Sequence, residues 1–265
     1  MGNRFFVLCR YTKNKEYFAM QKGGLFLIGM TMAVLLTACG NQADKTKTDA
    51  NASDGDSISI TTELNNYTAQ NPDVFAWLYV PGTGINYPLA QNVDGDDTYY
   101  LTHDCNGMTE SDKGGIYIES YNMMDMCDFN TIIHGKTTSD GDMFSELWNF
   151  ADENYFKEHD QFFIFLPDNT LTYEIYTAYK APNDNLFLKY DFTDVDSCQQ
   201  YLKDMKSNWT TKTNIREGWE EGVDPYNFLV SLSTVDANHP DVQWIVVGCL
   251  VGDAAGTIDR ELDED

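Results

Sequence analysis

The chain has 265 residues, of which 42% are hydrophobic, so it is long enough to form at least one well-packed domain. It carries 42 acidic and 17 basic residues, a net charge of −25 at pH 7. So acidic a chain argues against nucleic acid as a partner, because that binding depends on lysine and arginine neutralising phosphates.

The N-terminal segment has the pattern of an export signal. A short basic region precedes an apolar run, Leu25 to Ala38, that is shorter than the roughly 20 residues a transmembrane helix needs. The run ends in LTAC, whose last residue is Cys39, and this ending resembles the lipobox of bacterial lipoproteins. The resemblance implies that residues 1–38 are a lipoprotein signal peptide and that Cys39 carries a diacylglycerol. Met20 is a candidate for the true start, and an ordinary signal peptide or a weak membrane anchor is the alternative.

The exported part divides into three predicted segments. Residues 39–57, above all the stretch NQADKTKTDANASDGDS, are polar, which is typical of a flexible linker. Residues 58–255 have the hydrophobic patterning of a folded domain, and residues 256–265 form an acidic tail.

The domain is predicted to be mainly β. A short helix is expected first, because Ile60, Leu64 and Tyr67 recur at helical spacing. Eight runs rich in β-branched and aromatic residues then follow, separated by Gly, Pro, Asn and Asp. The runs are WLYVPG, GINYPLA, GGIYIES, FNTIIHG, FFIFLPD, LTYEIYTAY, FLVSLSTV and VQWIVVGCLV. Many short strands with few helices are typical of a β-barrel.

Two helical segments interrupt the predicted strands. One lies at about residues 143–156. The other follows Thr193, where Thr193 and Asp196 suggest an N-cap and apolar residues recur at helical spacing over Val195–Met205.

The cysteines and acidic clusters leave several possibilities open. Four exported cysteines other than Cys39 allow three full disulfide pairings, and they are Cys105, Cys127, Cys198 and Cys249. Cys249 lies in the apolar run WIVVGCLV, which favours a buried thiol. No cysteine or histidine spacing indicates a zinc site, and no cofactor is implied. Calcium is an alternative at two acidic clusters, Asp94–Asp97 and Asp140–Asp142, although DGD is also common in turns.

Five segments in chain order resemble class B sortases, the cysteine transpeptidases that join proteins with a sorting signal to the peptidoglycan of Gram-positive bacteria. The segments are NPDVFAWLYVPGTGINYPLAQ, DDTYYLTHDCNG, GGIYIE, NTIIHGKTTSDGDMF and LSTV. The resemblance covers residues 60–252 approximately. It implies a closed eight-stranded barrel with an N-terminal helix and a helix in the long connection before the penultimate strand.

The three catalytic positions of that family carry other residues in this chain. The family pattern NTIIYGHNM is NTIIHGKTT here, so the catalytic histidine falls on Lys136 and the tyrosine before it on His134. The family pattern LSTC is LSTV, so the nucleophile position holds Val235. The catalytic arginine, at the start of the last strand, corresponds to Gln243. Valine has no nucleophilic atom, so the resemblance implies a fold that has lost its transpeptidase chemistry.

The resulting hypothesis is a pseudoenzyme, anchored by lipid to the outer face of the cytoplasmic membrane of a Gram-positive bacterium. Its partner would be a sorting-signal peptide or a cell-wall or pilus protein. One alternative is an active class B sortase with a relocated nucleophile, for which Cys105 and Cys127 are the candidates. A second is a purely structural lipoprotein. A hydrolase that uses Thr234 or Ser233 with His134 or Lys136 is disfavoured, because alternate strand residues face opposite sides.

Overall fold

The computed structural model describes residues 54–92, 94–208, 213–219, 222–236, 238–256 and 258. The predicted signal peptide, Cys39, the larger part of the predicted linker and nearly all of the predicted acidic tail lie outside the described residues.

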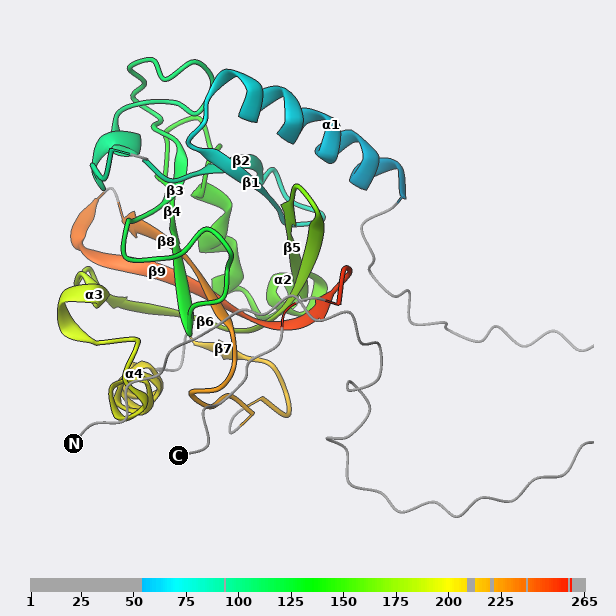
Figure 1. Ribbon diagram of the computed structural model, residues 1–265. Helices are drawn as coiled ribbons and strands as arrows, with labels where there is room; N and C mark the ends of the chain where they lie inside the picture. Colours follow the sequence, from blue (N-terminus) through cyan, green and yellow to red (C-terminus); the bar gives the residue numbers. More distant parts are fainter. Residues whose placement is uncertain are drawn as a thin grey trace, which may run out of the picture.

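A closed β-barrel forms the body of the protein (Figure 1). Around the barrel the strands are β5 (Gln161–Leu166), β1 (Val74–Tyr79), β2 (Asn86–Ala90), β3 (Ile116–Ile118), β4 (Asn130–His134), β8 (Leu229–Asp236), β9 (His239–Asp253) and β6 (Asn169–Pro182). Pairing of β5 with β6 closes the circle. The predicted eight-stranded barrel is therefore confirmed, and each predicted run supplies one of its strands. The short strand β7 (Asn214–Ile215), which was not predicted, adds to one edge of β6.

The strand directions determine which strand ends lie at the same edge of the barrel. Strands β2 and β3 are parallel, and so are β4 and β8, whereas the other neighbours are antiparallel. Because β4 and β8 run the same way, their carboxyl ends lie at the same edge of the barrel. Strand β9 starts at that edge, since it follows β8 after a tight connection.

Alternate side chains of the strands fill the barrel interior. Ile133 of β4, Leu232 of β8 and Val246 of β9 are completely buried in one hydrophobic cluster. The cluster leaves little free space, because a Cβ atom at Gly248 would lie 2.4 Å from the ring of Phe162. Close packing of this kind gives the barrel a fixed shape on which surface residues can be positioned.

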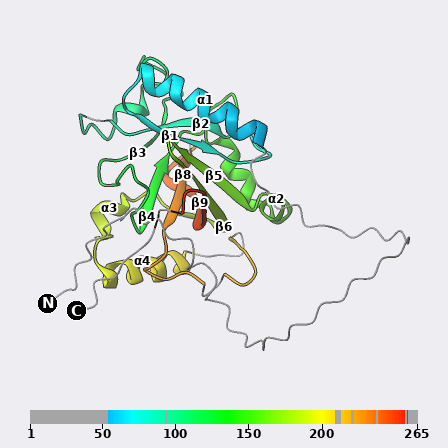
Figure 2. The same cartoon turned by 45° about the vertical axis from the view of Figure 1, so that its right-hand side comes forward.

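Helix α1 (Asp54–Gln70) lies across β1 and β2 on one side of the barrel (Figure 2). Ile60 and Leu64 are buried against this side, and the ring of Tyr67 contacts Trp77 edge-on at 5.4 Å between centroids. The predicted N-terminal helix is confirmed. It is longer than expected, because it begins at Asp54 and so includes the last four residues of the predicted linker.

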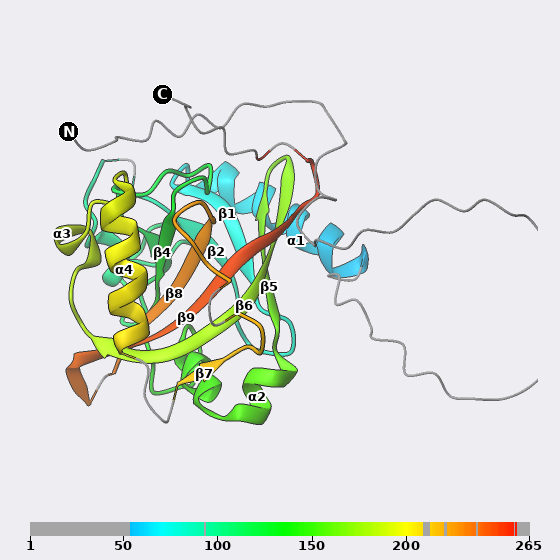
Figure 3. The same ribbon diagram turned by 90° about the horizontal axis from the view of Figure 1, so that it is seen from below.

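Helix α4 (Val195–Ser207) covers the opposite side of the barrel, as Figure 3 shows. Its buried residues, which include Leu202 and Met205, face a second hydrophobic cluster on β6 and β9. The N-cap is Asp194, whose carboxylate accepts a hydrogen bond from the Ser197 amide, so the predicted cap at Thr193 is wrong by one residue. The Thr193 hydroxyl instead donates to Asp191.

The segment predicted as one helix at residues 143–156 forms two shorter pieces, η2 (Ser145–Ala151) and α2 (Glu153–Glu158). Asp152 separates them with an extended backbone, and its carboxylate accepts hydrogen bonds from the first amides of α2. The short helices η1 (Tyr99–Leu101) and α3 (Leu186–Lys189) were not predicted. In the part of the chain that the structure describes, no helix is long and apolar enough to cross a membrane.

Candidate functional site

The strand register brings the three family positions together at one edge of the barrel. Val235, near the end of β8, is the direct antiparallel partner of Gln243 on β9. His134, the last residue of β4, is the parallel partner of Ser233 on β8, and Lys136 follows two residues later. Segments separated by about a hundred residues in the sequence therefore contribute to one surface.

This surface is a cavity of about 500 Å³, called the groove below. Its lining comes from the ends of β3, β4, β8 and β9, and from the chain between β6 and α3. The polar and charged side chains among the lining residues are Glu119, His134, Lys136, Thr137, Asn183, Asp184, Asn185, Ser231, Ser233, Asp236 and Gln243. Aromatic and aliphatic lining includes Tyr100, Leu101, Tyr117, Ile132, Leu186, Phe187, Val235, Pro240 and Ile245. A cavity of this size and mixed lining suits a peptide or another small ligand.

Val235 stands at the nucleophile position with 36% of its surface exposed. Access to this position is therefore open, but an isopropyl group offers no atom that could attack a carbonyl carbon.

The amide of Gln243 is buried and fully used in hydrogen bonds. Only 5% of the residue is exposed. Its Oε1 accepts a 2.7 Å hydrogen bond from the Ser233 hydroxyl, and its Nε2 donates to the carbonyl of Pro182 at 2.7 Å. The same Nε2 lies 3.5 Å from the Asp184 carbonyl. At this position the chain therefore has a neutral side chain that hydrogen-bonds β9 to Ser233 and Pro182, and it has no positive charge.

The hydroxyl groups beside Val235 are also engaged with partners other than histidine. Thr234 is not among the lining residues of the groove, and its Oγ1 lies 3.0 Å from Oγ1 of Thr137. The indole of Trp148 donates to the same Thr137 oxygen at 3.1 Å. Ser233 faces the groove but donates to Gln243, as described above. Neither hydroxyl forms the hydrogen bond to an imidazole that activates a serine or threonine nucleophile.

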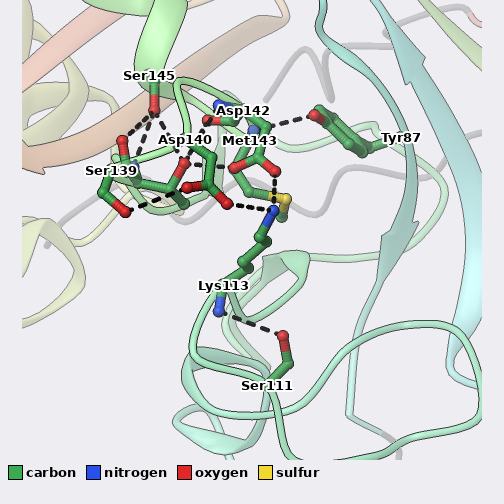
Figure 4. Close-up of polar contacts among 9 residues, drawn as sticks. Tyr87, Ser111, Lys113, Ser139, Asp140, Asp142, Met143 and Ser145 are labelled. Atoms are coloured by element: carbon green, nitrogen blue, oxygen red, sulfur yellow. Dashed lines mark hydrogen bonds and ion pairs between the residues drawn. The ribbon is translucent and has the colours of Figure 1, made fainter.

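Two lysines join the loop before β3 to the loop after β4, one lysine from each loop: Lys113 and Lys136. The Nζ of Lys136 donates a 3.0 Å hydrogen bond to the backbone carbonyl of Asp112. The next residue, Lys113, reaches back and forms ion pairs with Asp142 and, at 3.0 Å, with Asp140 (Figure 4). The loop before β3 and the loop after β4 are thus tied together twice. Lys136 takes part in this tie.

The turn at residues 138–145 has further fixed contacts. The Ser145 hydroxyl accepts from the Thr138 amide at 2.8 Å, and the Tyr87 hydroxyl accepts from the Met143 amide at 2.9 Å (Figure 4). Gly141 has a φ of 81°, a left-handed conformation that glycine adopts readily. Asp142 has its pKa lowered, chiefly by Lys113 and then by the Thr138 hydroxyl.

Four of the carboxylates considered for calcium, Asp96, Asp97, Asp140 and Asp142, have other partners. In the second acidic cluster, Asp140 and Asp142 pair with Lys113. In the first, Asp97 accepts from the backbone amide and the hydroxyl of Ser120, and Asp96 accepts from Thr98. Within the described residues, no group of three or more His, Cys, Asp or Glu side chains has a metal-site arrangement.

His134 lies in the groove beside Glu119. Its Nε2 is 3.5 Å from Oε1 of Glu119, but the geometry is not that of a hydrogen bond, and this nitrogen is buried without a hydrogen-bond partner. The ring stacks on Tyr117 at 5.3 Å. Burial lowers the pKa of His134 to about 4, against a smaller opposing effect of Asp97. The nearby Glu119 carboxylate favours a protonated His134, whereas burial favours the neutral ring. Because Nε2 forms no hydrogen bond to Glu119, burial is the stronger effect, and His134 is neutral at pH 7.

Glu119 is the functional-site residue that sequence reasoning missed. It directly follows β3, only 14% of its side chain is exposed, and its pKa is raised by burial and then by the charge of Asp97. Its position after a strand that ends at the groove was the available signal, just as His134 ends the neighbouring strand. Recognising it required the β3–β4 register, in which Tyr117 and His134 are partners.

The thiols lie away from the groove lining. Cys105, Cys198 and Cys249 are free and buried, so no disulfide joins any of these three to another. Burial raises the pKa of Cys105 and of Cys249 to about 12, which keeps both protonated and unreactive at neutral pH. Cys127, the other candidate nucleophile, is disulfide-bonded rather than a free thiol, and it is also absent from the groove lining. Three further histidines do not line the groove: His103, His159 and His239.

Two curated relatives are similar to this chain in sequence. Sortase B of Listeria monocytogenes is 28% identical over 178 residues, which are 67% of this chain and 68% of the relative. Sortase B of Staphylococcus aureus is 26% identical over 136 residues, 51% of this chain and 54% of the relative. No family model matches the chain.

Solved structures agree with the sequence comparison. Sortase B of Clostridium perfringens has a TM-score of 0.61 at 24% identity, covering 71% of this chain and 99% of that protein. A Streptococcus pyogenes class B sortase involved in pilus biogenesis has a TM-score of 0.60 at 25% identity, covering 71% and 98%. A complex of Staphylococcus aureus sortase B with its substrate has a TM-score of 0.60 at 22% identity, covering 72% and 85%. In its sequence relatives and in its barrel, the chain is similar to class B sortases and has their fold.

Proposed function

We propose that this protein is a catalytically inactive, lipid-anchored class B sortase that binds a sorting-signal peptide, or a cell-wall or pilus protein, through its groove. The observation that carries the proposal is the pair Val235–Gln243, which occupies the facing positions where the family has its cysteine and arginine. Transpeptidation needs a thiolate to attack the peptide carbonyl and a positive group beside it, and this pair has neither.

The surroundings of the pair support the loss of chemistry. The Gln243 amide is already engaged by Ser233 and Pro182, so it has no free donor for an oxyanion. The Lys136 ammonium donates a hydrogen bond to the Asp112 carbonyl, so the position of the family's histidine holds a lysine that is engaged with the loop before β3. The alternative of a relocated nucleophile finds little support, because the lining of the groove contains no cysteine.

Retention of the groove supports a binding role. Its walls are built on the strand ends of a closed barrel, and Val235 leaves the nucleophile position accessible. A Staphylococcus aureus sortase B is known as a substrate complex, and the Streptococcus pyogenes relative is involved in pilus biogenesis. Partners of the same kind are therefore proposed here. The anchor at Cys39 and a location on the outer face of the cytoplasmic membrane complete the proposal, although these residues lie outside the described structure.

The test uses the full chain purified in detergent and a fluorescent peptide that an active class B sortase cleaves. Cleavage, by fluorescence release, and binding, by anisotropy, are measured in the same samples, with the active sortase as positive control. Binding without cleavage is the expected result. Cleavage by this protein that persists in Val235→Ala would overturn the loss of activity. Absence of both signals would favour a purely structural lipoprotein.

A further inference from the structure

The charged groups around the groove are mostly negative. Three carboxylates, those of Glu119, Asp184 and Asp236, line it, and Lys136 is the lysine among its lining residues. The groove therefore presents more negative than positive charge to a ligand.

Two of these carboxylates have a basic neighbour outside the groove. Asp184 lies 3.9 Å from the ammonium of Lys189, and Asp236 lies 3.1 Å from Nδ1 of His239. The Lys136 ammonium donates to the carbonyl of Asp112, on the loop before β3.

Glu119 differs from the other two carboxylates. Among the described residues, no lysine or arginine lies within 4.0 Å of its oxygens. Its side-chain contacts are His134 Nε2 at 3.5 Å and the amide of Asn185 at 3.5 Å. Because His134 is neutral, Glu119 is a carboxylate with 14% exposure and no compensating cation. An uncompensated charge of this kind is costly and becomes favourable when an opposite charge reaches it.

The surroundings of Glu119 suit a long basic side chain. Phe187, on α3, lines the groove and is only partly buried, so it offers ring surface to a ligand. Tyr117, two residues before Glu119 on β3, also lines the groove but is 5% exposed and stacks on His134. Lysine and arginine pack their methylene groups along such surface while the charged end reaches a carboxylate. The net charge of −25 would also attract a basic segment towards this protein.

We propose that the groove selects a peptide with a lysine or arginine side chain, which pairs with Glu119. This inference rests on the proposed function, because it assumes that the groove holds a peptide. It adds a residue preference that the catalytic positions do not determine.

The test measures which amino-acid residues are enriched in peptides that bind the groove. The full chain, in detergent and immobilised, is incubated at pH 7 with a hexapeptide library whose ends are acetylated and amidated, so that side chains carry all peptide charge. Retained peptides are eluted and sequenced by mass spectrometry. Glu119→Gln keeps the size and removes the charge, and Glu158→Gln removes an exposed charge on α2 outside the groove lining. Thermal unfolding establishes that all three proteins are folded.

Enrichment of lysine or arginine by about tenfold, equivalent to one unit in the logarithm of affinity, is expected for the native protein and for Glu158→Gln. The enrichment should disappear in Glu119→Gln. Retained peptides without basic enrichment, or with the same enrichment in Glu119→Gln, would overturn this inference while leaving peptide binding in place. A native protein that retains no peptide would overturn the proposed function and this inference with it.

Discussion

The hydroxyl of Ser233 donates a 2.7 Å hydrogen bond to the side-chain carbonyl of Gln243, across the β8–β9 pair. The position that holds a catalytic arginine elsewhere in the family therefore has a structural role in this chain. We expect Gln243→Leu to destabilise the protein by about 1–3 kcal/mol, because it leaves the buried Ser233 hydroxyl without a partner and removes one of the two donors to the Pro182 carbonyl, the other being the Asp184 amide. The measurement is urea unfolding followed by tryptophan fluorescence. Val235→Ala, at a partly exposed site, serves as control and should change stability much less. Equal effects of the two substitutions would contradict this role.

A cysteine placed at position 235 should be reactive but insufficient for catalysis. The site is 36% exposed, so Val235→Cys is expected to react with a methanethiosulfonate reagent much faster than Val235→Ser. The buried thiols of Cys105 and Cys249 should contribute little to the signal, because their raised pKa values keep them protonated. Peptide cleavage by Val235→Cys alone should remain undetectable.

Recovery of cleavage should require all three positions together. The variant with Lys136→His, Val235→Cys and Gln243→Arg is expected to show slow cleavage of the sorting-signal peptide, because the family's nucleophile, proton-transfer group and cation are then present. Leaving out any one of the three changes should abolish it. Cleavage by the native protein, or by a variant that retains Val235, would show that the chemistry resides elsewhere.

His134 should make stability depend on acidity. Its folded pKa of about 4 lies below the unfolded value of 6.5, so between these values the unfolded chain binds a proton that the folded protein does not. Stability should therefore fall as pH decreases from 6.5 towards 4, by roughly 1–3 kcal/mol for this residue. Glu119, with a raised pKa, contributes in the opposite direction: its contribution decreases as pH rises through its folded pKa.

The control for this prediction is His134→Phe, which keeps a ring against Tyr117 and cannot titrate. Urea unfolding at several pH values should give a shallower decline for the variant below pH 6.5. The same slope in both proteins would mean that His134 is not responsible for the acid sensitivity.

Lys113 should restrain the turn that follows Lys136. Lys113→Met removes the pairs with Asp140 and Asp142, so amide hydrogen exchange at residues 138–143 should become faster. The midpoint of thermal unfolding should change little, since exposed ion pairs contribute little to global stability. Lys157→Met, which breaks the Glu153 pair on α2, is the matched control and should leave exchange in the turn unchanged. A lack of faster exchange in Lys113→Met would assign the order of the turn to its internal hydrogen bonds.

The barrel strands could be predicted because their residues carry a local signal. A run such as VQWIVVGCLV is rich in β-branched residues, and the structure places it in β9. Helix boundaries were harder to predict, because neighbouring polar side chains compete to cap the same backbone amides. At α4 the cap is Asp194, while the Thr193 hydroxyl donates a hydrogen bond to Asp191. Between η2 and α2, Asp152 ends one element and caps the next.

For the site, the positions of Lys136, Val235 and Gln243 came from family resemblance, and the structure places all three on the lining of one groove. The partners of these residues could not be predicted. The Gln243–Ser233 bond depends on the β8–β9 register, and Glu119 meets His134 only through the β3–β4 register. Contacts of this type depend on the tertiary fold, so they cannot be predicted from the spacing of residues along the chain.

The buried Gln243 amide also bears on how readily position 243 could accept an arginine. Glutamine and arginine at position 243 differ in more than charge, because the amide is both a donor and an acceptor, whereas a guanidinium only donates. A single reversion to arginine would leave the Ser233 hydroxyl facing a donor and would place a cation in a buried position before any nucleophile existed to benefit from it. Gln243→Arg on its own would thus make the protein less stable without making it active. Selection for folding alone would then favour glutamine over arginine at position 243.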